Sequence, residues 1–204
     1  MQNSPSIGRP VEFDRDKTQD VIMRLFWEKG FSAVSLPELE ARTGLSRSSL
    51  YNSFGSKHEM FEQSLELYRA AIGGQMYRAL ESGTGGLADL LAFFAAAAGR
   101  LTRDRAMAGC LLVNSMVEFG GEDGSVARNS SGHLQRLRQA FIKALERAVA
   151  LAEIPPGHLA EKANLLLGLL LGLSVAARAG LPQAEIGSLV NAASTQISGW
   201  SEIT

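Results

Sequence analysis

The sequence predicts an all-α fold of about nine helices, and three observations lead to this prediction. Apolar residues recur along most of the 204-residue chain with the spacing that is typical of amphipathic helices. Clusters of glycine and proline interrupt this pattern and separate one helix from the next. No segment alternates apolar and polar residues in the way that a half-buried strand rich in β-branched side chains does.

The N-terminal part of the chain carries the start and stop signals of four helices. Gly30 stands where the first helix needs a C-terminal cap. Residues 35–38 and 56–59 have the spacing of a capping box, in which a serine and a glutamate satisfy each other's backbone N–H groups. Ser46 is a favourable N-cap for a short helix between them. We therefore expect helices over residues 14–29, 36–44 and 46–55, and a longer helix from residue 57 onward.

Glycine and proline clusters divide the remainder of the chain into five further helical stretches. The clusters lie at residues 83–86, 120–124, 154–157 and 180–182. Residues 134–148 have a single apolar stripe beside basic side chains, which predicts an amphipathic helix at the surface. Residues 165–173 have no polar face, so this helix is expected to be covered on every side. The last helix is also unusually apolar, and this surplus predicts a homodimer held by the last two helices.

The sequence predicts no membrane span and no secretory leader. The strongly apolar uncharged run between Lys162 and Arg178 has 15 residues, fewer than the roughly 20 that cross a bilayer. The N-terminus is polar and lacks an apolar core followed by a cleavage site. With one cysteine the chain cannot form an internal disulfide framework. These features predict a cytoplasmic protein.

Composition and motifs exclude several classes of function. The chain has 20 Lys and Arg against 21 Asp and Glu, so any binding of nucleic acid must come from a local basic surface. Its three histidines and one cysteine are too far apart for zinc-site spacing, and we expect no metal and no cofactor. The sequence also lacks the G-x-S-x-G, P-loop, G-x-G-x-x-G and H-E-x-x-H motifs, so we expect no enzymatic activity.

The segment from Ser35 to Phe61 predicts a helix-turn-helix. A helix, a turn containing glycine and a short helix capped by serine follow one another, as in motifs that place the second helix in the DNA major groove. From Ala41 to His58 the chain has three basic residues and no acid, a local positive charge that suits phosphates. The same pattern also fits an ordinary helical hairpin with a solvated polar face, and these residues alone leave both interpretations open.

Residues 43–61, which read TGLSRSSLYNSFGSKHEMF, closely resemble the tetracycline-repressor (TetR) family of bacterial regulators. The likeness continues in residues 31–35 and is sharp over about residues 13–61. It implies a DNA-binding domain over residues 1–56, with a flexible arm at 1–12, and a ligand-binding and dimerisation domain over residues 57–204. The chain departs from the family at Glu40 and Thr43, where small alanines are usual, and at Ser48 and Ser49, which replace a common Gly-Thr.

The resemblance also implies roles for single residues of the predicted DNA interface. Family positions that contact phosphates correspond here to Ser35, Ser49, Tyr51 and Lys57. The expected base readers are Arg47, Ser48 and Asn52, because arginine suits guanine and asparagine suits adenine. A half-buried core ring is the alternative for Tyr51, and Leu50 and Phe54 are expected in the core. For Arg9, a minor-groove contact and a disordered tail both stay open.

Six residues of the C-terminal domain are candidates to line an effector pocket: Tyr68, Phe93, Phe94, Met107, Cys110 and Asn114. Methionine and aromatic residues at helical spacing fit a plain core equally well. Residues 108–114 resemble a segment of family members that respond to electrophiles or oxidants through a cysteine. Such reactivity needs a nearby positive charge, for example Arg103 or Arg105, and without one Cys110 is an inert packing residue.

These observations together predict a homodimeric transcriptional regulator. We expect it to bind a palindromic double-stranded DNA operator and, as a repressor, to be released by an unknown small-molecule effector. The alternative is a helical dimeric interaction protein without sequence-specific DNA binding. A stripe of small residues at Gly168, Gly172 and Ala176, which lets helices approach closely, supports that alternative. The sequence names neither the operator nor the effector.

Overall fold

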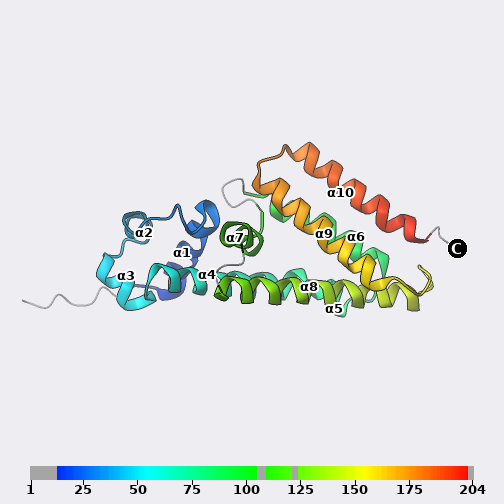
Figure 1. Ribbon diagram of the computed structural model, residues 1–204, viewed down its shortest axis with the longest axis horizontal. Coiled ribbons are helices and arrows are strands. Elements are labelled where there is room, and N and C mark those ends of the chain that lie inside the picture. The colour runs from blue at the N-terminus through cyan, green and yellow to red at the C-terminus, as the bar shows by residue number, and fades with distance from the viewer. Residues whose placement is uncertain (1–12, 105–108, 121–123, 202–204) are drawn as a thin grey trace, which may run out of the picture.

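The computed structural model describes residues 13–104, 109–120 and 124–201, and over these ranges the regular structure is entirely helical. In chain order the described elements are α1 (Arg15–Lys29), α2 (Leu36–Thr43), α3 (Arg47–Phe54), α4 (Lys57–Met76), α5 (Arg78–Ser82), α6 (Leu87–Leu101), α7 (Leu111–Phe119), α8 (Gly124–Ala150), α9 (Leu159–Arg178), α10 (Gln183–Ser198) and the 3-10 helix η1 (Gly199–Ser201). All of the α-helices except α5 have eight residues or more, which confirms the predicted all-α fold. Figure 1 shows α1–α3 at one end, α4 and α8 running lengthwise, and α6, α9 and α10 together at the other end.

Two helix boundaries could not be predicted, because no cluster of glycine or proline marks them in the sequence. α4 ends at Met76 and α5 begins at Arg78, and the buried Tyr77 between them stays close to helical (φ −92°, ψ −13°). Because the backbone stays nearly helical at this bend, the spacing of apolar residues in the sequence continues across it. The sequence therefore gives no sign that a new helix, α5, begins here. The second boundary separates α6 from α7, where Gly109 precedes the new helix with a positive φ of 78°.

Capping decides where the N-terminal helices begin. Ser56 and Glu59 form the complete capping box predicted for α4. The capping box predicted for α2 is not completed, because the side chain of Ser35 makes no cap hydrogen bond. Glu38 pairs with Lys29 of α1 instead. This ion pair ties α2 to α1, a tertiary contact that the local pattern cannot reveal.

Aromatic side chains join the N-terminal helices to the C-terminal domain. Phe26, Phe31 and Phe61 pack on one another with ring centroids between 5.1 and 6.1 Å apart. Phe119 of α7 packs on Phe31 at 5.3 Å and on Phe61 at 5.6 Å. Such pairs stabilise by more than their buried area alone. The two parts of the chain therefore share one aromatic cluster.

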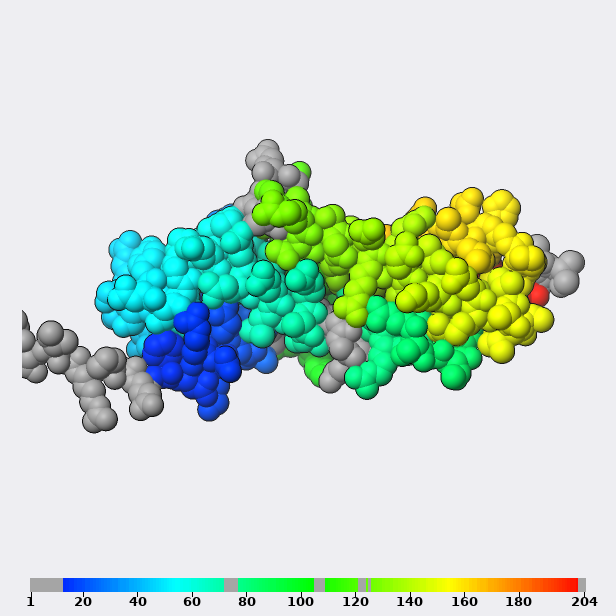
Figure 2. All heavy atoms as spheres, turned by 90° about the horizontal axis from the view of Figure 1, so that it is seen from below, coloured from blue at the N-terminus to red at the C-terminus, as the bar shows by residue number. Residues whose placement is uncertain are grey.

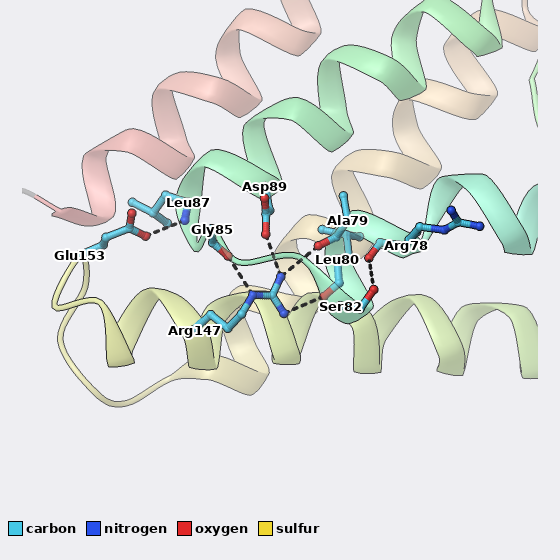
Figure 3. A network of polar contacts seen from close by, with 9 residues as sticks. All are labelled: Arg78, Ala79, Leu80, Ser82, Gly85, Leu87, Asp89, Arg147 and Glu153. Atoms are coloured by element: carbon cyan, nitrogen blue, oxygen red, sulfur yellow. Dashed lines mark hydrogen bonds and ion pairs between the residues drawn. The ribbon is translucent and has the colours of Figure 1, made fainter.

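Arg147 of α8 fastens the connection between α5 and α6, as Figure 3 shows. Its guanidinium donates hydrogen bonds of 2.8 to 3.1 Å to the carbonyl oxygens of Ala79, Leu80 and Gly85. It also pairs with the carboxylate of Asp89 at 2.9 Å. One side chain thus donates to three backbone carbonyl groups and pairs with one carboxylate. Without it, these groups would lose this hydrogen-bond partner.

Replacing Arg147 with alanine should lower the free energy of unfolding by about 2 to 3 kcal/mol, because these acceptors lose their donor. Thermal or urea unfolding of the purified protein measures the change. Lys143 is exposed on the same helix, and Lys143→Ala should change the free energy by less than about 0.5 kcal/mol. Equal stability of the two variants would contradict the structural role of Arg147.

α9 is long and apolar enough to cross a membrane by length and composition alone, with a mean hydropathy of 1.5. One such helix is weak support for a membrane protein, because core helices of soluble proteins pass the same test. Leu166, Leu170 and Leu173 are buried, whereas Leu165 is 44% exposed and Val175 is 49% exposed. In a single chain this helix is therefore covered on one side only, and its cover on the other side stays a prediction.

Candidate nucleic-acid interface and effector cavity

α3 presents a polar face to solvent because its apolar side chains face the core. Leu50 and Phe54 are buried, as predicted. Tyr51 is 38% exposed, and the guanidinium of Arg47 lies 5.7 Å from its ring centroid. The ring of Tyr51 is therefore partly open to solvent, and its phosphate contact stays a prediction. The open face of the helix carries four of the predicted contact residues, namely Arg47, Ser48, Tyr51 and Asn52.

The first turn of α3 is held by hydroxyl groups and by one carboxylate from α2. The N–H of Ser49 donates to Oγ of Ser46 at 3.3 Å, and this Oγ lies 3.0 Å from the hydroxyl oxygens of both Ser48 and Ser49. Glu40 of α2 accepts a hydrogen bond of 2.6 Å from the N–H of Arg47. Glu40, which departs from the family pattern, thus helps to fix the start of α3 relative to α2.

The other two predicted phosphate contacts, Ser35 and Lys57, lie at the starts of α2 and α4. Ser35 is exposed, as a phosphate contact requires. Lys57 is partly buried, and its ammonium group lies 4.4 Å from the ring centroid of Phe31. Burial lowers the pKa of Lys57, and the carboxylate of Glu118 opposes this effect. Lys57 thus faces the junction of the two domains, and its phosphate contact stays a prediction.

The basic residues near α3 differ from those that the sequence pattern indicated. Arg42 pairs with Glu28 of α1 at 3.4 Å, so part of its charge is compensated. Arg15, which the sequence pattern did not single out, lies at the start of α1 with its guanidinium 4.7 Å from the ring centroid of Phe54. It also donates to the carbonyl oxygen of Ser53. A contact between residues so far apart in the sequence gives no local signal.

Glu118, near the end of α7, holds the turn between α1 and α2. Its carboxylate accepts hydrogen bonds from the backbone N–H groups of Phe31 at 2.9 Å and Ser32 at 2.7 Å. Burial raises the pKa of Glu118, but the hydrogen bonds from Ser32 and Phe31 outweigh this effect and the pKa is lowered overall. The C-terminal domain thereby supplies the acceptor for two N–H groups of the DNA-binding domain.

Arg178, the last residue of α9, holds the other side of the same turn. Its guanidinium donates hydrogen bonds of 3.0 and 3.1 Å to the carbonyl oxygens of Trp27 and Glu28 at the end of α1. A cation at this position also suits the negative end of the helix dipole. Neither Glu118 nor Arg178 was predicted, because more than 80 residues separate each from its partners.

The C-terminal domain contains a cavity of about 30 Å³ between α4, α6, α7, α8 and α9, enough for about two water molecules. Its apolar walls are Ala97, Leu101, Val113, Leu137, Leu170 and Leu171. Five polar or ionisable side chains complete the lining, namely Tyr68, Arg100, Cys110, His133 and Ser174. Over the described part of the chain, no group of three or more histidine, cysteine or acidic side chains is placed to hold a metal ion.

The cavity contains two of the six predicted pocket residues, Tyr68 and Cys110. Asn114 lies instead along a separate open groove beside Arg178. Met107 falls outside the described residues. Sequence reasoning missed Arg100, His133 and Ser174, which come from three different helices and carry no shared motif.

Phe93 and Phe94 do not line the cavity, contrary to the prediction. Both are buried and pack on Phe141 of α8, with ring centroids 5.3 and 6.1 Å away. These residues therefore join α6 to α8 as part of the core. The structure supports the alternative interpretation, in which aromatic residues at helical spacing belong to the core.

Cys110 occupies the N-cap position of α7, and its side chain makes no cap hydrogen bond. Gly109 precedes it with a φ of 78°, and Cys110 itself has an extended conformation. The N–H of Cys110 donates to Oγ of Ser174 at 2.9 Å. This bond connects α7 to α9 directly at the cavity.

The surroundings of the Cys110 thiol favour a packing role. Burial raises its pKa, while hydrogen bonds from the Val113 backbone and the Tyr68 hydroxyl act in the opposite direction with smaller effect. A thiol with a raised pKa is mostly protonated at neutral pH and therefore weakly nucleophilic. The arginine that lowers this pKa slightly is Arg100, not the predicted Arg103, which is exposed. Arg105 falls outside the described residues.

His133 of α8 separates the cavity from an outer cleft. Its ring is buried, and Nδ1 shares a hydrogen bond of 2.7 Å with the hydroxyl of Tyr77. Burial lowers the pKa of His133 to about 4, with further lowering by Arg136 and Arg69. The imidazole is therefore neutral at physiological pH. Burial likewise raises the pKa of Tyr77, so its phenol is also uncharged.

A helix-turn-helix with an open polar recognition face, joined to a helical domain that encloses a cavity, defines a DNA-binding regulator. The chain belongs to the tetR family of bacterial regulatory proteins. The family's N-terminal model matches residues 20–63, and the model of the tetracyclin repressor-like C-terminal domain matches residues 86–189. Membership confirms the resemblance and the expectation of a non-enzymatic protein. It also removes the alternative of an interaction protein without DNA binding.

Similar proteins cover between 70% and 97% of the chain. The chain is 32% identical over 206 aligned residues to the HTH-type transcriptional repressor ComR of Escherichia coli (strain K12), covering 97% of this chain and 94% of ComR. It is 26% identical to the uncharacterized HTH-type transcriptional regulator YezE of Bacillus subtilis (strain 168), covering 70% and 73% of the two chains. A cysteine-substituted TetR family regulator, CifR, in complex with 26-base-pair double-strand operator DNA superposes with a TM-score of 0.81, at 26% identity over 92% of this chain and 98% of CifR.

Proposed function

We propose that the protein is a homodimeric cytoplasmic repressor that binds a palindromic operator and is released by a small molecule. The open face of α3 carries this proposal, because Arg47, Ser48, Tyr51 and Asn52 project from a helix whose other face is buried. Two relatives support it: ComR is named a repressor, and CifR was solved with operator DNA. In a dimer, two copies of α3 would enter successive major grooves, roughly 34 to 36 Å apart.

Selection of bound fragments from the source genome tests the DNA part of this proposal. We expect the recovered fragments to share an inverted repeat whose half-sites are one helical turn apart. Affinity for that repeat should fall steeply with salt, because phosphate contacts release counterions. Fragments without a common sequence, or affinity independent of salt, would contradict the proposal.

Exposed apolar side chains on α9 and α10 support a dimer through these two helices. Leu165 and Val175 of α9 are joined by Leu189 of α10, which is 42% exposed. Gly172 lies on the open side of α9, and a Cβ added there would meet nothing within 4 Å in the single chain. A second copy packed on this face would bury well over about 1,200 Å², as stable interfaces do.

Gly172→Glu should convert the dimer to a monomer at micromolar concentration, because it places a charge into close helix packing. Light scattering measures the change of mass. Gly99→Glu is the matched control, since Gly99 is also exposed in a helix and has nothing within 4 Å of an added Cβ. A dimer for both variants, with unchanged thermal stability, would place the interface elsewhere.

Release by an effector is supported by the position of the cavity between α7 and α9. Val113 and Ser174 line the cavity, and the same two helices end in the contacts of Glu118 and Arg178 with the α1–α2 turn. A ligand that moves α7 relative to α9 would move the two sides of this turn relative to each other. Such a ligand would favour the conformation in which the two α3 helices no longer match the operator.

A further inference from the structure

We propose that the cavity takes an organic anion, an apolar molecule whose carboxylate is held by Arg100. This inference rests on the proposed function, because it names the chemical class of the effector. It follows from three observations: a cation without an acidic partner in the cavity wall, neutral donors beside it, and an outer cleft that gives a route to it.

Arg100 is the charged member of the cavity wall. Its side chain is half-buried near the end of α6, and its charge acts on the phenols of Tyr68 and Tyr77 and on the thiol of Cys110. Over the described residues, no carboxylate forms an ion pair with Arg100, and none lines the cavity. A partly buried guanidinium beside apolar walls is normally paired, so the wall lacks the anion that would complement it.

The other polar groups of the cavity favour an anion over a cation. The hydroxyl of Tyr68 is an uncharged donor, because burial raises the pKa of its phenol well above the ordinary value. His133 is neutral because burial lowers its pKa. The Cys110 thiol is protonated because burial raises its pKa. Ser174 already accepts a hydrogen bond from the Cys110 N–H. A carboxylate placed here would meet one cation and several donors, and no competing negative charge.

An outer cleft of about 570 Å³ between α4 and α8 offers a route to this site. Figure 2 looks onto the face where these two helices lie side by side. Arg69, Arg136 and the carboxylate of Glu66 line the cleft. Arg136 is paired with Glu81 at 2.7 Å. His133 borders both the cleft and the inner cavity. The charges of Glu66 and Glu81 balance those of the two arginines, so the cleft supplies access to the His133 ring, which separates the two spaces, but no surplus of positive charge.

The small size of the cavity links binding to release. At about 30 Å³ it is smaller than any aromatic or aliphatic acid, so such a ligand must push apart the helices that form the walls. Leu137 of α8 and Leu170 of α9 line the wall with apolar side chains, so moving them breaks no hydrogen bond of these side chains. Their displacement would act on α9, which ends at Arg178 and its contact with α1.

Benzoate, benzamide and benzylamine test this inference, because they share one ring and differ in charge. Each is added at millimolar concentration to the purified full-length protein, and the unfolding temperature and operator affinity are measured. We expect benzoate to raise the unfolding temperature by several degrees and to weaken operator binding about tenfold. Benzamide and benzylamine should do neither. Equal effects of the three compounds, or no effect of benzoate, would overturn the inference.

Arg100→Gln should abolish the response to benzoate, whereas Arg100→Lys should keep part of it because the charge remains. Arg103→Gln is the matched control, since Arg103 is exposed shortly after α6 and should leave the response unchanged. Operator affinity of each variant without benzoate shows that it is folded and binds DNA. Normal operator binding with an unchanged benzoate response in Arg100→Gln would refute this inference alone, whereas absent operator binding by the wild type would refute the proposed function.

Discussion

Replacing Arg47 with alanine is expected to weaken binding to the selected operator by about 1 to 3 kcal/mol for each half-site. In the proposed dimer the loss occurs twice, so affinity for the full operator should fall by about 2 to 6 kcal/mol. The reason is that Arg47 is exposed on the open face of α3, where its guanidinium can bond two acceptors of one base. Affinity for unrelated DNA should change much less. Titration of both DNAs at several salt concentrations measures the difference.

Lys57→Ala serves as the comparison for this experiment. A phosphate contact predicts that the variant loses affinity about equally for all sequences and that the salt slope decreases by about one. If the side chain of Lys57 remains on the ring of Phe31, where the structure places it, the salt slope will not change. Equal operator affinity of the wild type and both variants would contradict the assignment of α3 as the recognition helix.

Removing Glu118 and Arg178 together should lower the free energy of unfolding by about 3 to 4 kcal/mol and largely uncouple operator binding from the effector. Glu118→Ala with Arg178→Ala removes four charge-assisted hydrogen bonds to the α1–α2 turn. Partial contact with solvent reduces the contribution of each bond. Hydrogen exchange should show loss of protection at the amides of Phe31 and Ser32. Val117→Ala and Arg103→Ala, at exposed positions, are the controls.

The contribution of Glu118 should also depend on pH with a defined sign. Because its pKa in the folded protein is lowered, the carboxylate stabilises the fold above its unfolded pKa of about 4.3 and loses this effect as pH falls through the folded value. The difference in stability between wild type and Glu118→Gln should therefore shrink in acid. A difference that is constant from neutral pH to strongly acidic pH would show that the two hydrogen bonds contribute little.

Features that depend on neighbouring residues could be predicted from the sequence. The capping box at Ser56 and Glu59, the serine cap of α3 and the burial of Leu50 and Phe54 follow from spacing within a few residues. The same local logic placed four of the predicted contact residues on one open face. It failed at Ser35, because the partner of Glu38 lies on another helix.

Features that depend on distant contacts could not be predicted. Tyr68 and Cys110 share a cavity with Arg100 and His133 only because five helices converge there. The spacing of aromatic residues that suggested Phe93 and Phe94 as pocket residues is the same for core residues and pocket residues. In the structure both rings pack on Phe141. No periodicity distinguishes these cases, because it reports which face of a helix is apolar and not what lies opposite.

The hydrogen bond from the Arg47 N–H to the carboxylate of Glu40 limits how operator specificity can be transplanted. A relative with alanine at the position of Glu40 starts its recognition helix without this bond, so exchanging only α3 would place a helix built for a different first turn against Glu40. The new helix would then start at a different angle to α2, and side chains of the right type would reach the wrong base pairs. A chimaera made to redirect this regulator should therefore exchange residues 36–54 as one cassette, with both helices and the turn from a single donor.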